Sequence, residues 1–158
     1  MEKKRIAVIR IKGDPGLKAN IRRTFKLLKL YKKNHLVIIP NTPEYIGMLN
    51  KIKDASTWGE IDRETFELLL EKRGKLPGKE SLKENYLKEK NKMNFEEFSK
   101  NFMEFKIELK DVPGLKTFFK LSPPRHGFEK EGLKAQFAMG GALGYRKNAV
   151  NDLIKRMV

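Results

Sequence analysis

The sequence predicts an α+β fold in which an antiparallel sheet is backed by helices. Two short runs rich in β-branched residues alternate with longer segments whose apolar residues recur at helical spacing. Clusters of Gly and Pro separate these segments and mark turns. With 158 residues, of which 39% are hydrophobic, the chain can bury one ordinary core and carry an extension.

The N-terminal part of this pattern is strand, helix and strand. Residues 5–12 (RIAVIRIK) are expected to form a strand, because they are rich in β-branched side chains and stop at the turn sequence GDPG. Residues 17–33 are expected to form a helix, and residues 35–40 (HLVIIP) a second strand. The apolar face of this helix comprises Leu17, Ile21, Phe25, Leu28 and Tyr31.

A second helix is expected to follow the second strand. Thr42 can serve as its N-cap, Pro43 fits the first helical position, and Glu44 places an acid in the first turn. Residues 58–61 can supply a brief third strand, which gives the order β-α-β-α-β found in ferredoxin-like domains. The buried face of the second helix is expected to be Tyr45, Met48, Leu49 and Ile52.

The middle of the chain is predicted to be helical. Asp62 can cap a helix that ends near Gly74, and Ser81 with Glu84 has the spacing of a capping box for another. Asn94, with Glu97 three residues later, can cap a third helix. The aromatic stripe of that helix, which should pack into the core, comprises Phe95, Phe98, Phe102 and Phe105.

The C-terminal third is predicted to hold a strand, a long loop and a helix. A β-prone stretch ends at Leu121, and residues 122–144 form a loop rich in Pro, Gly and basic residues. The last helix is expected at residues 148–157. Its buried face should be Val150, Leu153, Ile154 and Met157.

Positive charge is concentrated toward the two ends of the chain. The chain has 35 Lys and Arg against 20 Asp and Glu, a formal net charge of +15. Residues 1–58 carry +10, residues 59–111 carry −1, and residues 112–158 carry +6. Such charge favours a polyanionic partner, above all the phosphate backbone of a nucleic acid. The same boundaries predict a core domain at 1–58, a helical insertion at 59–111 and a basic extension at 112–158 that packs on the core.

Several classes of protein are disfavoured. With no cysteine, the chain has no disulfide, thiolate zinc site or thiol nucleophile. No apolar run approaches the roughly 18 residues of a membrane span, and the start lacks a signal-peptide pattern, so we expect an intracellular protein. His35 and His126 lie far apart in sequence, and no nucleophile elbow or zinc-protease spacing occurs. We therefore expect no metal, no cofactor and no catalysis.

The first helix has a basic stripe opposite its apolar face. At about 100° per residue its cations fall on one side and could meet several successive phosphates. The alternative is an ordinary solvated face, but such faces usually interleave Glu with Lys, and no acid occurs between Asp14 and Glu44. The predicted RNA contacts on this stripe are Lys18, Arg22, Lys26, Lys29 and Lys33.

The loop at residues 122–134 (SPPRHGFEKEGLK) has the composition of an RNA-binding segment. It combines prolines, glycines, cations and Phe128, an aromatic that could stack on an unpaired base. The alternative is a connecting loop whose Phe128 folds back into the core. The predicted RNA contacts here are Arg125, His126, Lys130 and Lys134.

A glycine-rich segment, GGALGYRK at residues 140–147, precedes the last helix. Glycines ahead of a helix can expose amide donors to anions, and Arg146 and Lys147 are further predicted RNA contacts. The segment lacks the ending of a P-loop and the strand of a dinucleotide fingerprint, which argues against nucleotide binding. It can bind an RNA phosphate or simply turn the chain.

Taken together, these segments resemble large-subunit ribosomal protein number thirty in its archaeal and eukaryotic branch, whose eukaryotic member is numbered seven. The resemblance covers nearly the whole chain: IAVIRIKG, LVIIPNTPEYIGMLNKIKD, LSPPRHGFEKEGLK and GGALGYRKNAVNDLIKRM. The last two are the specific ones, because the β-α-β-α-β core alone fits many domains. The chain starts almost at the first strand, without the long basic tail of eukaryotic members, so we expect the archaeal branch.

The resemblance implies a structural constituent of the large ribosomal subunit, bound to cytoplasmic ribosomes. It further implies that the protein docks on large-subunit rRNA close to 5S rRNA and contacts neighbouring ribosomal proteins. One alternative is a non-ribosomal RNA-binding processing or chaperone factor. A more remote one is a small ferredoxin-like enzyme acting on phosphorylated substrates, against which stands the absence of a nucleophile, a base and an orienting partner.

Overall fold

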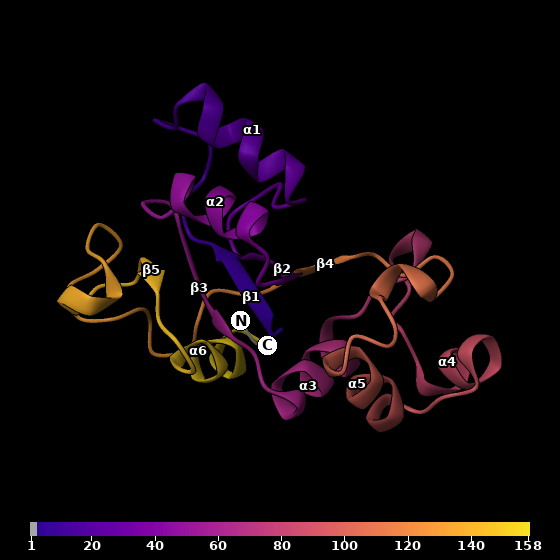
Figure 1. The fold of residues 1–158 in the computed structure, drawn as a ribbon. Coiled ribbons are helices and arrows are strands. Elements are labelled where there is room, and N and C mark those ends of the chain that lie inside the picture. Colours follow the sequence, from indigo (N-terminus) through magenta and orange to yellow (C-terminus); the bar gives the residue numbers. More distant parts are fainter. Residues whose placement is uncertain (1–2) are drawn as a thin grey trace.

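A computed structural model describes residues 3–158 and confirms the α+β class (Figure 1). Its sheet has the strand order β4-β2-β1-β3-β5. All neighbouring strands pair antiparallel except β3 and β5, which are parallel. The strands are β1 (Arg5–Arg10), β2 (His35–Pro40), β3 (Ser56–Glu60), β4 (Phe118–Lys120) and β5 (Gly144–Tyr145).

Strand β1 lies at the centre of the sheet, and all six of its residues are buried. Val8 is paired with Val37 on one side and with Trp58 on the other. Successive side chains of a strand point to opposite faces, so the β-branched run supplies apolar groups to both faces of the sheet.

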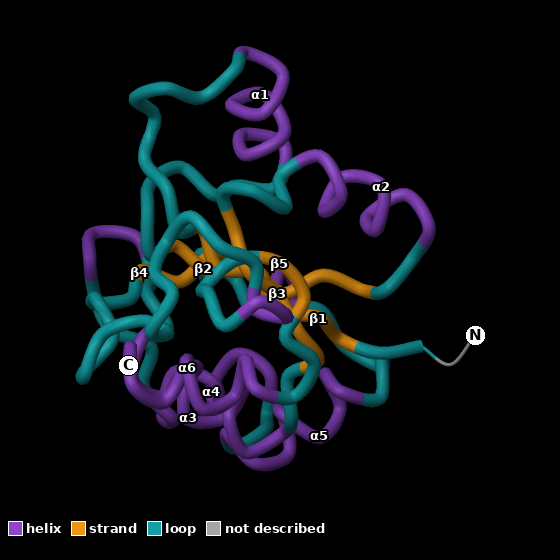
Figure 2. Tube along the Cα trace, turned by 90° about the vertical axis from the view of Figure 1, so that its left-hand side faces the viewer, coloured by secondary structure: helices purple, strands orange, loops and turns teal. Residues whose placement is uncertain are grey.

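Two helices cover one face of the sheet, α1 (Ala19–Leu27) and α2 (Pro43–Lys51). Figure 2 shows both on the same side of the strands. Their inward residues form one core cluster with strand residues of that face. The buried members are Ile6, Val8, Phe25, Leu28, Leu30, Val37, Ile39, Leu49, Ile52, Ala55 and Trp58.

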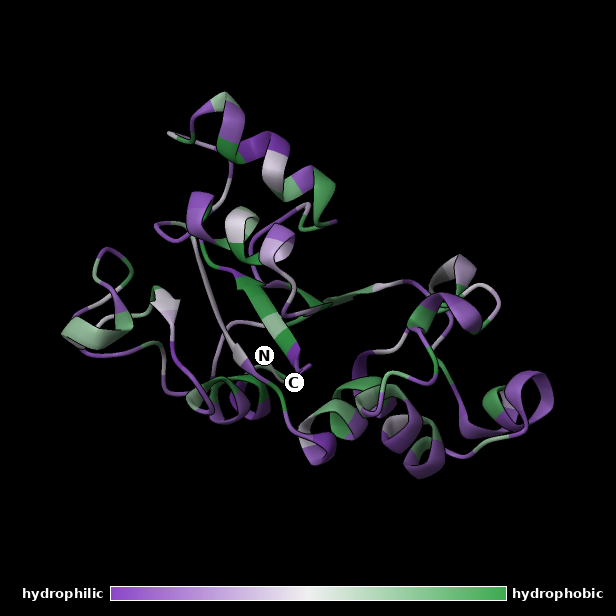
Figure 3. Ribbon diagram, viewed as in Figure 1, coloured by the Kyte–Doolittle hydropathy of each residue, from purple (hydrophilic) through white to green (hydrophobic). Residues whose placement is uncertain are grey.

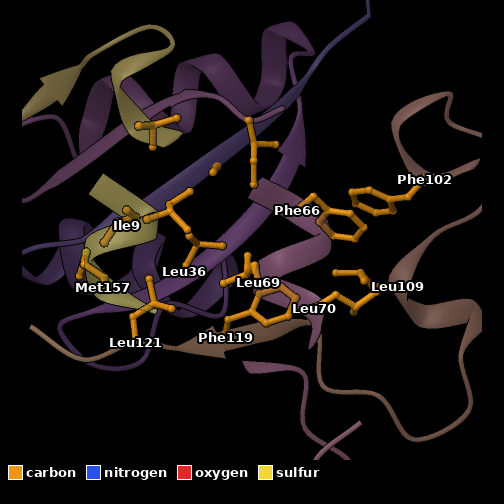
Figure 4. Packing of buried hydrophobic residues seen from close by; sticks show 14 of the residues in the cluster. Ile9, Leu36, Phe66, Leu69, Leu70, Phe102, Leu109, Phe119, Leu121 and Met157 are labelled. Atoms are coloured by element: carbon orange, nitrogen blue, oxygen red, sulfur yellow. The ribbon is translucent and has the colours of Figure 1, made fainter. Parts of the chain in front are cut away.

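The remaining helices lie on the opposite side of the sheet (Figures 1 and 2). They are α3 (Arg63–Arg73), α4 (Glu84–Asn91), α5 (Phe95–Met103) and α6 (Ala149–Met157), with short 3₁₀ turns at Pro77–Lys79, Leu109–Asp111 and Phe137–Met139. A larger core fills this side (Figure 4), in which the rings of Phe66 and Phe102 stack with centroids 4.3 Å apart. The helices α3, α4, α5 and α6 and the strand β4 therefore belong to one packed body with β1.

Local capping signals predicted several boundaries correctly. The Asp62 carboxylate accepts a hydrogen bond from Thr65 N, and α3 ends just before Gly74. The Asn94 side chain accepts from Glu97 N at the start of α5. The predicted inward face of α6, comprising Val150, Leu153, Ile154 and Met157, is buried throughout.

Two expected elements are wrong in their boundaries. The helix expected at residues 17–33 is confined to Ala19–Leu27. The capping box expected at Ser81 is absent, because α4 starts at Glu84 with Lys83 as an N-cap whose side chain makes no capping bond. Ser81 instead pairs with Lys75 in an isolated bridge, which closes the loop between α3 and α4.

Candidate nucleic-acid interface

Helix α1 presents cations on the side that faces away from the sheet. Its residues Thr24 and Phe25 are buried against the sheet side, and most of its other residues are hydrophilic (Figure 3). The sequence has no acid between Asp14 and Glu44, so Asp14 is the carboxylate that lines a hollow with the α1 cations. The exposed cations on α1 and immediately before it are Lys18, Arg22, Arg23 and Lys26.

The helix ends earlier than its apolar spacing predicts. Leu30 N donates to Phe25 O at 2.8 Å, and Lys29 N donates to Lys26 O at 3.1 Å, with Lys29 at φ 63°. This is a Schellman motif with lysine at the position that usually holds glycine. It turns the chain so that Leu30 joins Phe25 in the core.

The basic stripe expected on one helix therefore stops at Lys26. Lys29 is exposed beyond the helix end, where its Nζ donates to Thr117 Oγ1 at 3.1 Å. Lys33 is exposed in the loop before β2. Both cations remain at the surface, but they continue along a loop and not along a helix.

Arg10, at the end of β1, holds the following loop in place. Its guanidinium is buried and donates to Lys12 O at 2.8 Å, to Leu30 O at 2.9 Å and to Asp14 Oδ1 at 2.7 Å. The hydrogen bond and charge of Arg10 hold the pKa of Asp14 below its usual value. The charges of Arg22 and Lys26 on α1 lower this pKa further, by smaller amounts.

Tyr31 stands between two cation-lined hollows. It was expected to lie on the apolar face of a long helix, but its side chain is 46% exposed, because the chain has already left the helix. A hollow of about 400 Å³ is lined by Arg22, Arg23 and Lys26 together with Tyr31. A second, of about 650 Å³, is lined by Lys12, Lys32 and Lys33 together with Tyr31.

The C-terminal basic segment reaches the second hollow. Leu133, which is 42% exposed, is part of its lining, and Lys134 follows as an exposed residue. The segment is tied to the turn before β3, where Gln136 Nε2 donates to Asp54 Oδ1 at 3.2 Å. The two basic parts of the sequence therefore meet at the end of the sheet where β1 stops and β2 and β3 begin.

The loop after β4 caps the C-terminal end of α6. Ser122 N donates to Met157 O and Arg125 N to Arg156 O, each at 3.0 Å. The Arg125 guanidinium also donates to Lys155 O at 3.2 Å. These donors satisfy carbonyls that a helix end leaves unpaired. The predicted contacts of this segment and of its continuation are all exposed: Arg125, His126, Lys130, Lys134 and Lys147.

Arg146 lies in a different environment from the other predicted contacts. Only 2% of the residue is exposed, and its guanidinium forms an ion pair with Glu129 at 2.5 Å. It also donates to Thr57 Oγ1 at 2.8 Å and to Ala142 O at 2.8 Å. Arg146 thus joins the loop to β3, and its charge is already compensated inside the protein. We correct its expected role accordingly.

The loop residues that suggested base stacking and a phosphate cradle have packing roles. Phe128 is partly buried against the main core, as the alternative interpretation predicts. Gly141 is buried so close to Ala135 that an added Cβ would lie 2.1 Å from the Ala135 carbonyl oxygen. Gly140 and Gly144 have φ of 89° and 82°. These glycines allow the chain to turn and to pack tightly.

The two histidines are placed differently. His35 is buried in β2 and stacks on Phe118 at 5.3 Å, whereas His126 is exposed. Within residues 3–158 no group of three His, Asp or Glu side chains could hold a metal ion. No helix within residues 3–158 is long and apolar enough to cross a membrane.

Five residues that line the two hollows were not among the contacts predicted from sequence. They are Arg10, Lys12, Arg23, Tyr31 and Lys32. Arg23 and Lys32 adjoin predicted contacts, so the density of cations alone could have included them. Tyr31 was assigned to the core because no glycine marks the helix end. Nothing in the sequence distinguishes Arg10 from a surface arginine, since its partners depend on the folded loop.

Comparisons with known proteins identify relatives along nearly the whole chain. Residues 6–55 match a family model described as ribosomal protein L30p/L7e. The chain is 44% identical over 152 residues to large ribosomal subunit protein uL30 of Methanococcus maripaludis, covering 96% of this chain and 98% of the relative. It is 45% identical over 149 residues to the protein of the same name from Methanopyrus kandleri, covering 94% and 100%. For that of Nanoarchaeum equitans, identity is 45% over 152 residues, covering 96% and 97%.

Proposed function

This chain belongs to the ribosomal protein L30p/L7e family, and we propose that it is a structural constituent of the large ribosomal subunit that binds and positions rRNA. Its task is to neutralise phosphates and to fix RNA segments relative to one another. Such work requires a rigid scaffold with cations on its surface and no catalytic group.

One observation carries this proposal: the cations of the N-terminal part and the C-terminal basic segment meet at one end of the sheet. Lys12, Lys32 and Lys33 line the same hollow as Leu133 of the C-terminal segment. Uniformly distributed solubilising charge does not produce such a convergence, whereas a surface that holds a folded polyanion requires it.

We assign the RNA contacts to cations of the two basic segments, all of which are exposed except the half-buried Lys12. Lys12, Arg23 and Lys32 are added because they line the same hollows. Arg146 is assigned to holding the loop. The contacts expected from sequence that we retain are Lys18, Arg22, Lys26, Lys29, Lys33, Arg125, His126, Lys130, Lys134 and Lys147.

The family also bears on the neighbours of this protein. We propose that it lies beside other ribosomal proteins in cytoplasmic large subunits, close to 5S rRNA. Short-range crosslinking in purified large subunits tests the last point. Crosslinks to 5S rRNA, or to large-subunit rRNA adjacent to it, are expected, and crosslinks confined to distant rRNA would contradict it.

Sucrose-gradient fractionation of cell extract tests the ribosomal role directly. The protein should cosediment with large subunits at moderate salt. Its affinity for deproteinised large-subunit rRNA should fall by about 0.7 to 0.9 log units per tenfold rise in salt for each phosphate neutralised. Recovery only in fractions free of large subunits would instead indicate a processing or chaperone factor, and a flat salt response would contradict binding to phosphates.

A further inference from the structure

We propose that Tyr31 is the platform on which one unpaired base of the bound RNA stacks, with the cations of the two adjoining hollows holding the phosphates beside it. This inference rests on the proposed function and deepens it, because it names the kind of nucleotide that the interface takes. Neither the basic stripe nor the glycine-rich segment provides such a contact.

The Tyr31 ring is exposed and supported from behind. Its side chain is 46% exposed, and its ring meets Phe118 edge to face with centroids 5.4 Å apart. Phe118 in turn stacks on buried His35 at 5.3 Å. A ring fixed in this way loses little conformational freedom when a base stacks on it, so the contact can contribute fully to affinity.

Cations lie on both sides of the ring. The hollow toward α1 is lined by Arg22, Arg23 and Lys26, and the hollow toward the C-terminal loop by Lys12, Lys32 and Lys33. Tyr31 is common to both, as are Arg10 and Asp14, which form an ion pair with each other. A nucleotide whose base covers the ring would therefore have cations near the phosphates that precede and follow it, as in proteins that bind single-stranded RNA.

The geometry favours an unpaired base over a base pair. Bases inside an RNA helix are covered by their neighbours in the stack and offer no free face to a side chain, whereas loops and bulges expose theirs. The second hollow, of about 650 Å³, is large enough for one flipped-out nucleotide, and Leu133 adds an apolar surface to it.

A second tyrosine provides a matched comparison. Among the described residues, the exposed aromatic side chains are Tyr31 and Tyr145, the latter 44% exposed. Tyr145 lines a hollow with Trp58 and Glu60 and without Lys or Arg, and its hydroxyl donates to the Glu60 carboxylate. Exposure of the ring is thus nearly equal at the two sites, while the charge around it differs. Of these two exposed tyrosines, only Tyr31 combines a π face with neighbouring cations.

The test compares full-length variants for binding to deproteinised large-subunit rRNA over a series of salt concentrations. Tyr31→Leu keeps an apolar contact with Phe118 but removes the π face, and we expect affinity to fall about 5- to 150-fold, the range for one stacked base. Tyr31→Phe should bind within about threefold of the wild type, because the ring is kept. Tyr145→Leu should also bind within that range. The salt dependence should be unchanged in all three, because the phosphate contacts remain.

A second measurement does not depend on the stability of the leucine variant. Tyr31→Trp should fold and bind rRNA. Its fluorescence in excess of the wild-type Trp58 signal should be quenched by rRNA, because a base stacks on the indole of the new tryptophan. Heparin, a polyanion without bases, should compete for the cations and leave that fluorescence unquenched.

The outcomes separate this inference from the ribosomal role. If Tyr31→Leu binds as tightly as wild type while binding still weakens steeply with salt, the stacking contact is refuted and the RNA-binding role stands. Equal weakening of Tyr31→Leu and Tyr31→Phe would assign the contact to the hydroxyl and also overturn it, as would equal quenching by heparin. If the wild type shows no salt-dependent binding to rRNA, the proposed function itself fails.

Discussion

Three arginines of this basic chain are turned inward: Arg5, Arg10 and Arg146 are each 2% exposed. Each guanidinium donates to a carboxylate and to at least one backbone carbonyl, and each lies over an aromatic ring. Arginine suits this task because its planar fork satisfies several acceptors at once. These residues fasten segments to the sheet, so the net charge overstates the cations available to RNA.

For Arg146 this structural role predicts a large loss of stability on substitution. Arg146→Met would leave the Glu129 carboxylate without its partner, and the free energy of unfolding should fall by roughly 3–5 kcal/mol. Arg146→Lys should retain only part of the lost stability, because an ammonium group cannot make the several hydrogen bonds of the planar guanidinium. Urea unfolding measures both, with exposed Lys155→Ala as a control expected to change stability by at most about 0.5 kcal/mol. Wild-type stability of Arg146→Met would refute the role.

His35 should make the protein less stable in mild acid. Burial, followed by the charges of Lys120 and Lys32, lowers the pKa of His35 from 6.5 to about 4. Between these values the unfolded chain binds more protons at this site, so the free energy of unfolding should decrease as pH falls from about 6.5 to 4, by roughly 2–3 kcal/mol. The contribution levels off about one pH unit above 6.5, where the unfolded imidazole is neutral.

Urea titrations at closely spaced pH values can isolate this contribution. His35→Gln should flatten the decline relative to wild type. His126→Asn provides the control, since asparagine tolerates the positive φ of that exposed residue. Parallel curves for wild type and His35→Gln across this range would show that the ring does not titrate as expected.

The exposure of the α1 cations could be anticipated from sequence, whereas the burial of Arg146 could not. A run of cations without acids between Asp14 and Glu44 is a local signal for a basic surface. The partners of Arg146 include Glu129, 17 residues away, and Thr57, 89 residues away. Sequence spacing contains no information about such contacts, because they exist only once the loop has packed on β3.

At the scale of elements, those encoded by neighbouring residues were predicted, and those that depend on contacts distant in sequence were not. The strands β1 and β2 and the caps at Asp62 and Asn94 are encoded by neighbouring residues, and they were found. The end of α1 was missed because its Schellman turn has Lys29 and not glycine, and β5 was missed because two residues carry no pattern. Ser81 has capping spacing, but tertiary pairing with Lys75 prevails over it.

The lysine at the end of α1 gives a prediction for that element. Lys29 has φ 63°, which a glycine adopts without strain, so Lys29→Gly should raise the free energy of unfolding by about 0.5–1 kcal/mol. Lys26→Gly, three residues earlier and within the helix, should lower it by about 1 kcal/mol. Thermal unfolding of the pair distinguishes them, and destabilisation by both would contradict a helix end at this position.

At the scale of the whole molecule, the sheet separates two functions. Helix α1 and the loops at the end of β1 carry most of the cations of residues 1–58, and the near-neutral residues 59–111 pack their helices on the opposite side (Figure 1). The aromatic cluster of Phe66, Phe98 and Phe102 stabilises that side. The part of the chain that packs this aromatic core therefore has no excess of positive charge.

Because the cations lie on one side, we expect the affinity for rRNA to depend on where positive charges are removed and not only on how many are removed. Two triple alanine variants would each reduce the net charge from +15 to +12. One removes the α1 cations and the other removes exposed lysines in and before α4: Arg22, Arg23 and Lys26 against Lys83, Lys88 and Lys90. If each α1 cation neutralises one phosphate, the first variant should lose about 2 to 3 units from the slope of log affinity against log salt, and the second should keep the wild-type slope. Filter binding to deproteinised large-subunit rRNA measures both, and equal slopes for the two variants would mean that RNA responds to the total charge of the protein and not to this surface.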